Sequence, residues 1–428
     1  MLILPQMVEF LFGSKLKKMA AREERLIQQC QEIVRQMQIE KLNKLLLHFV
    51  KFDFYKKLLG AHGCVDVRLD NINEIDRLPI MTKQIIISNF DMLSARSEAN
   101  YITSTSGSTG VNIKFCHCKG VQAAKRMALI VMYRWMGVDF FTDRKLAVWG
   151  VHPGAKWTTK LMEHFKALIK NGKVICAFGL DERKSMKFLR DISDYKPKLI
   201  TAYPNYAYDL AMAGLKYHLE PPRSLRAIVL SGEMIYDFQV EAIERFFKCK
   251  VYRRYGSREF GNIAHECRYG GSLHVIPSRF YLENGADGEL LVTDLDNLAT
   301  PFIRYQIGDI GQVSAIQCKC GFQHQSILNI QGRSHDVIRT KTGKQVPGQF
   351  WTVLSRCVPG IKQFQVVQRN LEAIDFNIIT TKDYRDSEAH KLFEALKKVA
   401  GDEFCMNINK VDSIIPSASG KHKYIIKL

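Results

Sequence analysis

The sequence predicts an α/β protein with a large N-terminal domain of βαβ sheets, a small β subdomain and a small α+β C-terminal domain. Between residues 145 and 253, strand-like apolar runs alternate with helical runs, which is typical of a parallel sheet covered by helices. Past residue 280 the strands become short and Gly turns separate them, and residues 337–428 form a further compact pattern. We therefore expect two domains, at 1–332 and 333–428.

The N-terminal part is expected to be helical. Between residues 15 and 60, apolar side chains recur at helical spacing, as at Leu26, Cys30, Ile33, Val34 and Met37. Thr82 follows Leu78-Pro79-Ile80-Met81 and is a good helix N-cap, because its hydroxyl can accept from a backbone N–H of the first turn. Residues Val111–Cys116 are expected to form a strand.

The alternating region supplies the main sheet. Strands are predicted at Leu146–Trp149, Val174–Phe178, Leu199–Tyr203, Ala227–Leu230 and Lys250–Arg253. Helices are predicted between them, including Glu182–Ile192 and Phe238–Phe247.

The last third of the chain contains turns and a second small fold. The Gly turn at 285–288 precedes a strand at Glu289–Thr293, and Gly332–Asp336 is a candidate linker. Strands at 361–368 and 373–380 and a helix at 386–400 then predict the α+β C-terminal unit.

Composition excludes several classes of protein. With 428 residues, 46% hydrophobic and 25% charged, the chain can bury a large core, and its apolar stretches are too short for a membrane span. Met1–Gly13 is apolar but lacks the flanks of a signal peptide, so we interpret it as a docking segment. The 11 scattered cysteines are expected to be reduced, in a cytoplasmic protein.

The net charge of +19 favours anionic partners. Nucleotides, coenzyme A, nucleic acid and acidic membranes are all candidates by charge alone. The basic residues are dispersed, without a run of five or more like charges, so no nucleic-acid surface is expected. The oligomeric state is not predicted.

The segment Thr103–Gly110 is the strongest candidate binding loop. Its eight residues carry six hydroxyls and two glycines, a composition that lets backbone N–H groups and hydroxyls approach a phosphate. The loop lacks the Gly-Lys-Ser/Thr ending of a Walker A motif. By itself such a Ser/Thr/Gly segment is more often a flexible turn.

Further candidates follow predicted strands, where ligands bind in open α/β sheets. Ser231-Gly232-Glu233 follows one strand, and Tyr255-Gly256-Ser257-Arg258-Glu259 ends another, with an aromatic ring for a nucleotide or acyl pocket and a carboxylate for Mg²⁺. Asp309 could accept hydrogen bonds from both ribose hydroxyls. Lys421, beside Gly420, suits a mobile cation that meets a phosphate when a domain closes. Each of these segments alone is also compatible with an ordinary turn or tail.

Together these segments resemble the adenylate-forming superfamily of acyl-CoA synthetases, nonribosomal adenylation domains and luciferase. The resemblance runs from about Phe54 to the C-terminus and is closest to the phenylacetate–CoA ligase branch and its CapK-like proteins. Nine segments occur in the family's order: Phe54-Tyr55, Leu78-Pro79-Ile80, Thr105–Gly110, Ala202-Tyr203-Pro204, Ser231–Glu233, Tyr255–Glu259, Arg304–Asp309, Gly332-Arg333 and Ser419–Lys421.

The resemblance implies a reaction in which a carboxylate and ATP form acyl-AMP and pyrophosphate, before a nucleophile takes the acyl group. It implies that Glu259 ligates Mg²⁺ and that Lys421 bridges the carboxylate and the α-phosphate. Asp309 would hold the ribose, and Arg333 would contact ribose or phosphate. The implied nucleotide-binding residues are Thr105, Ser106, Gly107, Ser108, Thr109 and Gly110 at the phosphates, and Ser231, Gly232, Glu233, Tyr255, Gly256 and Ser257 around the adenine and its strand end.

Three departures from the family pattern stand out. Arg258 occupies a position where many members carry Thr, so the α-phosphate contact falls to Ser257 or Arg258. His335 stands where many carry the hinge aspartate, which leaves Asp336 as an alternative pivot. No Pro-Lys follows Gly110.

Four further residues are candidates for a structural Zn²⁺ site. Cys267 and His274 are followed by Cys318 and Cys320, and three thiolates with an imidazole suit a closed tetrahedral site. The alternative is four unconnected residues, because the gap between the pairs is long.

The acid and its acceptor are left open. Tyr203, Asn205 and Trp149 are candidates for the acid pocket, which would favour an aromatic or apolar acid, although aromatic residues at strand ends are often core. Coenzyme A is the expected acceptor, and a carrier protein, an amine or a sugar hydroxyl is the alternative. A nucleotide-binding member without catalysis, and a non-enzymatic basic binding protein, are the remaining readings.

Overall fold

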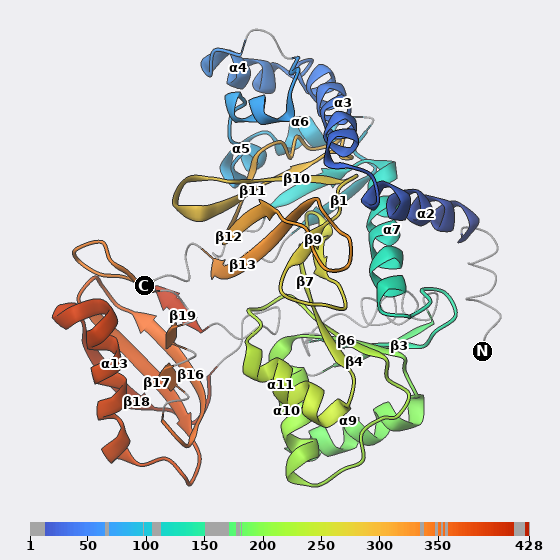
Figure 1. Ribbon diagram of the computed structural model, residues 1–428. Coiled ribbons are helices and arrows are strands. Elements are labelled where there is room, and N and C mark those ends of the chain that lie inside the picture. Colours follow the sequence, from blue (N-terminus) through green and yellow to red (C-terminus); the bar gives the residue numbers. More distant parts are fainter. Residues whose placement is uncertain are drawn as a thin grey trace. The chain divides into compact units, whose positions relative to one another are not determined.

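The structure is a computed structural model that describes residues 13–64, 68–96, 98–104, 113–149, 171–176, 180, 182–333, 338–346, 350–351, 354–355, 358–414 and 424–427. The chain forms two compact units. The first comprises Met1–Gly285, Leu290–Ile307 and Gln312–Asn329, and the second comprises Ala286–Glu289, Gly308–Gly311 and Ile330–Leu428. Figure 1 shows the elements of each unit.

Helices form the N-terminal part of the first unit, as predicted. They are α2 (Ser14–Ile27), α3 (Gln31–Phe49), α4 (Asp53–Ala61), the 3₁₀ turn η2 (Ile72–Arg77), α5 (Lys83–Ser88) and α6 (Phe90–Ser94). Thr82 caps α5 as expected, because its hydroxyl accepts from the Ile85 N–H at 3.3 Å. Arg304 donates to the carbonyls of Asp76 and Leu78, at 2.7 and 2.5 Å, and so anchors the Leu78-Pro79-Ile80 segment.

The core of the first unit is an 11-stranded sheet in the order β10-β11-β12-β13-β9-β8-β7-β6-β5-β3-β4. Its strands are β3 (Lys145–Trp149), β4 (Gly172–Cys176), β5 (Leu199–Ala202), β6 (Ala227–Leu230), β7 (Lys250–Ser257), β8 (Gly261–Glu266), β9 (Leu273–Val275), β10 (Phe280–Asn284), β11 (Glu289–Asp294), β12 (Tyr305–Ala315) and β13 (Gln325–Arg333).

The predicted parallel sheet is confirmed. Strands β4, β3, β5, β6 and the first half of β7 pair in parallel. Helices α9 (Glu182–Tyr195), α10 (Pro204–Lys216) and α11 (Asp237–Phe247) pack apolar side chains against it in one buried cluster. Figure 1 shows these three helices beside the strands that they cover.

Strand β7 joins this parallel sheet to the predicted β subdomain. Its residues 250–253 pair in parallel with β6, and its residues 254–257 pair antiparallel with β8. The register shifts between Tyr255 and Gly256, which is a β-bulge or a similar irregularity. The subdomain is therefore continuous with the parallel sheet through one strand.

A separate hairpin precedes the parallel strands. It consists of β1 (Tyr101–Ser104) and β2 (Lys114–His117), which pair antiparallel with Ser104 opposite Lys114. Helix α7 (Lys119–Trp135) follows β2 directly. Residues Val111 and Asn112 of the predicted strand lie outside the described residues, and the strand continues to His117.

The second unit contains a four-stranded sheet in the order β18-β17-β16-β19. The predicted strands at 361–368 and 373–380 are confirmed as β16 (Ile361–Gln368) and β17 (Ala373–Thr380), joined by β18 (Cys405–Lys410) and β19 (Ile425–Lys427). The predicted helix at 386–400 is divided into the 3₁₀ turn η5 (Asp386–Glu388) and α13 (His390–Ala400). A short hairpin, β14 (Ile338–Arg339) and β15 (Gln345–Val346), and the 3₁₀ turns η3 (Ala286–Gly288) and η6 (Gly401–Glu403) complete the elements.

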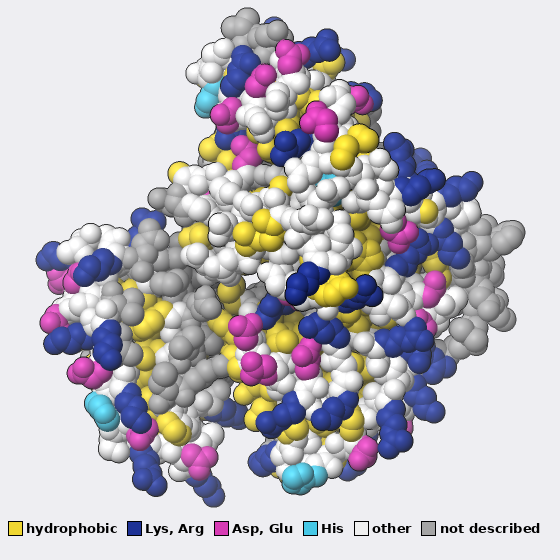
Figure 2. Space-filling view, in the orientation of Figure 1, with side chains coloured by type: hydrophobic (Ala, Val, Ile, Leu, Met, Phe, Trp, Pro, Cys, Tyr) yellow, Lys and Arg dark blue, Asp and Glu magenta, His cyan; other side chains and the backbone are white. Residues whose placement is uncertain are grey.

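The basic side chains are dispersed over the surface, as the sequence predicts. Figure 2 shows Lys and Arg side chains spread over the visible face rather than gathered in one patch. Among the described residues, no helix combines the length and the apolar character that crossing a membrane requires.

The contact between α10 and α11 depends on a glycine. A Cβ on Gly214 would lie 2.2 Å from the Phe246 ring, so the two helices approach only because that atom is missing. We expect Gly214→Ala to lower the free energy of unfolding by about 1–3 kcal/mol, measured by urea denaturation, because the ring must move within a packed core.

Gly60 is the matched control, since it also lies in a helix but has nothing within 4 Å of its added Cβ. We expect Gly60→Ala to be neutral or to stabilise the protein by up to about 1 kcal/mol, through helix propensity. Equal effects of both changes would contradict the packing argument.

Candidate active site

The carboxyl ends of the parallel strands bring the predicted pocket residues together. Val148 pairs with Ala202, and Ala202 pairs with Leu230, so the residues that follow emerge along one edge. Trp149 and Tyr203 meet there edge to face, with ring centroids 4.4 Å apart. This edge is where ligands bind in open α/β sheets.

Glu233 is held by a chain of side-chain amides at the same edge. Asn205 Nδ2 donates to the Glu233 carboxylate at 2.9 Å, and Gln239 Nε2 donates to Asn205 Oδ1 at 2.9 Å. Gln239 is buried, and its own carbonyl accepts from the Tyr236 N–H at the start of α11. Sequence reasoning missed Gln239, because its N-cap is Tyr236 and not the Ser or Thr that marks a capping box in a sequence.

Charges surround the phenol of Tyr203. Burial is the main cause that raises its pKa to about 12, and the nearby Glu233 carboxylate adds to this shift while Arg258 opposes it. Tyr203, Glu233 and Arg258 therefore face one region, which combines an aromatic wall with one negative and one positive group.

The end of β7 carries Tyr255–Glu259 in a tight conformation. A Cβ on Gly256 would lie 2.0 Å from the Gly261 carbonyl oxygen, so only glycine fits this turn between β7 and β8. Glu259 is 6% exposed, whereas Arg258 is exposed. The strand thus ends with a buried carboxylate next to an accessible guanidinium.

Hydrogen bonds connect this strand end to the β1–β2 hairpin. Arg258 Nη1 donates to the Ser104 carbonyl at 3.1 Å, and His117 Nε2 lies 2.7 Å from the Glu259 carbonyl. Lys125 Nζ donates to the Arg258 carbonyl at 3.1 Å. His117 and Lys125 were missed by the sequence reasoning. Lys125 could have been noticed, because it lies on the apolar stripe of α7.

Burial makes this network electrostatically unusual. It lowers the pKa of His117 to about 4, so the ring is neutral at neutral pH. It also lowers the pKa of Lys125 to about 8. Arg279 and Asp294 are fully buried nearby and lie 4.0 Å apart, and both contribute to the field at Lys125.

Several predicted site residues fall where the structure gives no description. Thr105–Gly110, His335, Asp336 and Lys421 lie outside the described residues, and so does the side chain of Arg333 at the end of β13. Asp309 lies on β12, in the short segment 308–311 that belongs to the second unit, and is half-buried.

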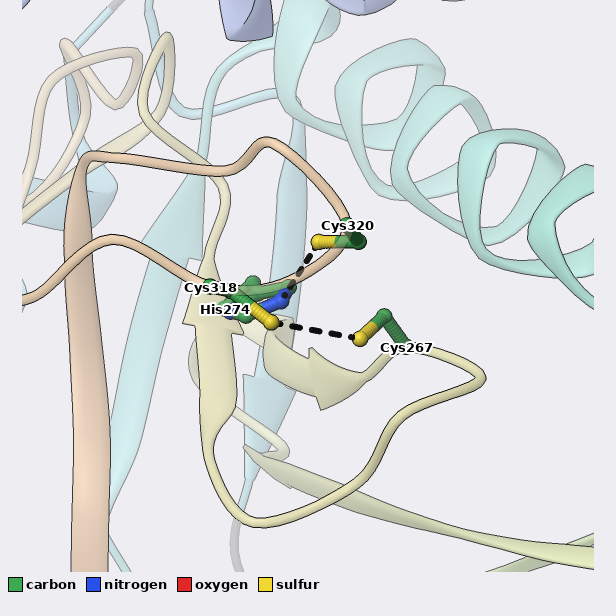
Figure 3. Close-up of side chains that lie close together, drawn as sticks. All are labelled: Cys267, His274, Cys318 and Cys320. Carbon is green, nitrogen blue, oxygen red and sulfur yellow. Dashed lines mark hydrogen bonds between the residues drawn. The ribbon is translucent and has the colours of Figure 1, made fainter.

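The four candidate zinc ligands do come together. Their ligand atoms all lie within 4.8 Å of one another, although 51 residues separate Cys267 from Cys318. Cys267 follows β8, His274 lies in β9, and Cys318 and Cys320 lie in the turn between β12 and β13 (Figure 3). The reading of four unconnected residues is therefore wrong.

Two distances within this cluster are close to those expected in a tetrahedral zinc site. Cys267 Sγ and Cys318 Sγ are 3.7 Å apart, and Cys320 Sγ lies 3.3 Å from His274 Nε2. Zn–S bonds of about 2.3 Å and Zn–N bonds of about 2.0 Å give tetrahedral edges of roughly 3.5–3.8 Å. His274 Nδ1 lies 3.1 Å from Ser326 Oγ, which orients Nε2 toward the thiols.

Two protein-family models match this chain. The model of the AMP-binding enzyme family matches residues 25–278, and the CapK C-terminal domain matches residues 338–428. The chain belongs to the AMP-binding enzyme family. The match covers more than half of the chain and spans the β1–β2 hairpin and the whole carboxyl edge.

Two curated relatives resemble this AMP-binding enzyme along most of their length. It is 22% identical to Protein CapK of Staphylococcus aureus over 384 residues, covering 87% of this chain and 84% of the relative. It is 24% identical to phenylacetate-coenzyme A ligase of Thermus thermophilus over 376 residues, covering 80% of each.

Solved structures share the fold. A 2-hydroxyisobutyryl-CoA ligase in the postadenylation state superimposes with a TM-score of 0.70 at 16% identity, covering 91% of this chain and 88% of that one. The O-succinylbenzoate coenzyme A synthetase of Bacillus subtilis, in complex with AMP, gives 0.53 at 17% identity, covering 76% and 67%.

The predicted fold, superfamily and enzyme class are thereby confirmed. This AMP-binding enzyme is an adenylate-forming ligase, which activates a carboxylate with ATP and then transfers the acyl group.

The link between Asn205 and Glu233 can be tested by an isosteric change. Asn205→Asp replaces the amide donor with a second carboxylate at 2.9 Å from Glu233. Two adjacent carboxylates repel each other when both are ionised, so the pKa of one of them is raised in the folded state above its value in the unfolded chain. The variant therefore loses stability as the pH rises from the unfolded pKa to the folded one. We expect a loss of about 1–3 kcal/mol at pH 8 that shrinks toward pH 5, measured by urea unfolding.

Asn43→Asp is the control for this change. Asn43 Nδ2 also donates a hydrogen bond, at 2.8 Å, but its partner is the neutral carbonyl of Leu69. A pH dependence as strong in this control as in Asn205→Asp would contradict a direct effect of Glu233.

Proposed function

We propose that this enzyme is an acid–thiol ligase that uses coenzyme A as acceptor. In the first step a carboxylate oxygen attacks the α-phosphorus of ATP, and pyrophosphate leaves. In the second step the thiol sulfur attacks the acyl carbon, its proton is lost, and AMP leaves. The observation that carries the proposal is the carboxyl edge, where aromatic rings, Glu233, Arg258 and the buried Glu259 converge in a chain of this family.

Glu259 is the proposed ligand of Mg²⁺. A carboxylate oxygen is the donor that Mg²⁺ prefers, and Glu259 lies two residues after β7, in the turn that follows the ligand-binding edge of the sheet. When bound, Mg²⁺ neutralises phosphate charge. Arg258, whose guanidinium already reaches Ser104 at the start of the phosphate loop, is proposed to contact the α-phosphate, with Ser257 beside it.

The remaining nucleotide contacts are proposals from the family pattern. Thr105–Gly110 would bind the β- and γ-phosphates, and Lys421 would reach the α-phosphate when the C-terminal unit closes as a lid. Ser231, Gly232, Glu233 and Tyr255 would surround the adenine, with Gly256 forming the tight turn. Asp309 would contact the ribose, and Arg333 the ribose or a phosphate.

The acid is proposed to be aromatic or apolar. Trp149 and Tyr203 supply a T-shaped aromatic wall, which favours stacking or apolar contact with a substrate. Asn205 is proposed to act through Glu233, to which its amide is bonded.

A second acceptor class is kept as the alternative, because the matches do not all name a coenzyme A ligase. Residues 338–428 match the CapK C-terminal domain, and a curated relative is named Protein CapK. The alternative acceptor is an amine, a sugar hydroxyl or a carrier-protein thiol. Assaying each acceptor with the preformed acyl adenylate distinguishes these possibilities.

The Cys267, His274, Cys318 and Cys320 cluster is proposed to hold a structural Zn²⁺. Three thiolates and one imidazole close a tetrahedral site, and no position is left for substrate. The site would fasten the β8–β9 connection to the β12–β13 turn. Trp135 packs against His274, with ring centroids 5.7 Å apart, so its fluorescence would report on the metal.

ATP–pyrophosphate exchange tests the first half-reaction. We expect at least one acid in an aromatic and aliphatic panel to stimulate exchange. Glu259→Gln and Lys421→Ala are each expected to lower the exchange rate by about 10²-fold or more, because each removes a charge that acts at the phosphates. Lys427→Ala is the control for loss of a C-terminal positive charge. Absence of stimulation by every acid, with no effect of Lys421→Ala, would overturn the proposal.

Metal analysis tests the zinc site. We expect about one Zn²⁺ per chain, lost in the double variant Cys318→Ser/Cys320→Ser, whose thermal midpoint should fall by roughly 5–10 °C because a bound staple stabilises only the folded state. The control is Cys30→Ser/Cys405→Ser, which changes two exposed cysteines outside the cluster. Full zinc content in the first double variant would contradict the assignment.

A further inference from the structure

Two strands flank the phosphate loop, and both are bonded to the same dipeptide at the end of β7. Ser104, the last residue of β1, accepts from the Arg258 guanidinium at 3.1 Å. His117, the last residue of β2, contacts the Glu259 carbonyl at 2.7 Å. The hairpin that carries the loop is therefore fastened to Arg258 and Glu259 from both of its arms.

Lys125 completes this connection from the adjacent helix. It donates to the Arg258 carbonyl at 3.1 Å, and its Nζ lies 3.3 Å from His117 Nε2. Two consecutive carbonyls, those of Arg258 and Glu259, are thus held by side chains from α7 and β2. Neither bond is part of the sheet ladder, so these two side chains add restraints on the dipeptide that the strand pairing does not provide.

The fold makes room for Lys125 at this point. Gly261 has a φ of +75°, and an added Cβ would meet Cγ and Cδ of Lys125 at 3.0 and 3.1 Å. The aliphatic stem of the lysine therefore lies against a glycine that has no side chain to block it. A lysine on the apolar stripe of a helix is costly to bury, and here its ammonium is directed to a backbone carbonyl at the candidate site.

Another buried basic side chain, Arg279, lies beside this dipeptide and has partners of its own. Arg279 is fully buried, lies 3.5 Å from Asp296 and donates to the Phe260 carbonyl at 3.3 Å. It therefore holds the residue that follows Glu259. The carbonyls of Arg258, Glu259 and Phe260 are each contacted by a different basic side chain.

We propose that Lys125 and His117 are positioning residues that fix the Arg258–Glu259 backbone and couple it to the phosphate-loop hairpin. This inference rests on the proposed function, in which Glu259 holds Mg²⁺ and the loop binds the phosphates of ATP. Held carbonyls restrict the directions that the two side chains can take. The Glu259 carboxylate is then oriented before Mg·ATP arrives, and less entropy is lost on binding.

A positioning role for Lys125 predicts different effects on Mg·ATP binding and on the acid substrate. Loss of the bond from Lys125 to the Arg258 carbonyl should weaken Mg·ATP binding and lower kcat. The Glu259 carboxylate would then no longer be held in a fixed position relative to the phosphate-loop hairpin. The KM for the acid should stay within about twofold, because Trp149 and Tyr203 do not depend on Lys125. Residues that orient metal ligands typically change metal affinity by about 10–100-fold when they are removed.

The experiment compares Lys125→Met with Lys125→Arg and a matched control. Calorimetric titration with Mg²⁺ and a non-hydrolysable ATP analogue measures binding without knowledge of the acid, and Mn²⁺ titration followed by electron paramagnetic resonance measures the metal directly. We expect Lys125→Met to weaken both by about 10-fold or more. Lys125→Arg, which keeps a donor, should recover most of the affinity.

Lys145→Met is the control for loss of a buried lysine. Lys145 is 8% exposed, donates to the carbonyls of Phe140 and Asp143 at 2.8 and 2.5 Å, and begins β3 at the amino end of the strand. The Lys145→Met change should lower the free energy of unfolding without changing the affinity for Mg²⁺ and nucleotide. Equal weakening in this control would show that general destabilisation explains the effect, and would overturn the inference.

The His117 variants test the same idea independently. His117→Gln keeps an amide donor for the Glu259 carbonyl, whereas His117→Leu removes it, so only the second should weaken binding. This pair decides the matter if Lys125→Met does not fold. Failure of the unchanged protein to bind Mg²⁺ and nucleotide would overturn the proposed function. Normal binding in the unchanged protein together with unaltered binding in Lys125→Met and His117→Leu would overturn the positioning role alone.

Discussion

The change of partner along β7 is the constraint on which the rest of the first unit depends. Its first four residues complete the parallel sheet, and its last four begin the antiparallel subdomain. A strand that belongs to both must continue past the carboxyl edge at which the other parallel strands end. Tyr255–Glu259 is therefore carried beyond that edge. A side chain at Gly256 would collide with the Gly261 carbonyl of the returning strand, and one at Gly261 would meet the aliphatic stem of Lys125.

The chemistry at this edge follows from which polar groups are held and which are left accessible. Glu233 is oriented through Asn205 and Gln239, and the Arg258–Glu259 carbonyls through Lys125 and His117. Buried polar groups of this kind stabilise little beyond an apolar core, but they specify one orientation. The site thus combines an exposed charge at Arg258 and a half-buried one at Glu233 with buried polar side chains that orient them.

The Cys and His cluster brings together two connections of the β subdomain. The β8–β9 and β12–β13 connections are far apart in sequence, and β9 has only three residues to hold them together. His274 stacks on Phe322 at 4.2 Å with an interplanar angle of 13°, and Trp135 packs on both rings. A metal bound by the four residues would add covalent-like strength where the hydrogen-bonded ladder is short.

Local patterns in the chain were enough for the α/β class, the parallel strands, the Thr82 cap and two strands of the C-terminal unit, β16 and β17. These depend on spacing and on nearest neighbours, which the sequence displays directly. The family motifs likewise pointed to Glu259 and Arg258 by position. Only the tertiary structure decided that Gln239, His117 and Lys125 lie at the site, that Asn205 bonds to Glu233, and that Cys267 meets Cys318. Such contacts join residues up to 142 positions apart, as in the bond from His117 to Glu259, and no periodicity records a pairing that exists only once the sheet has closed.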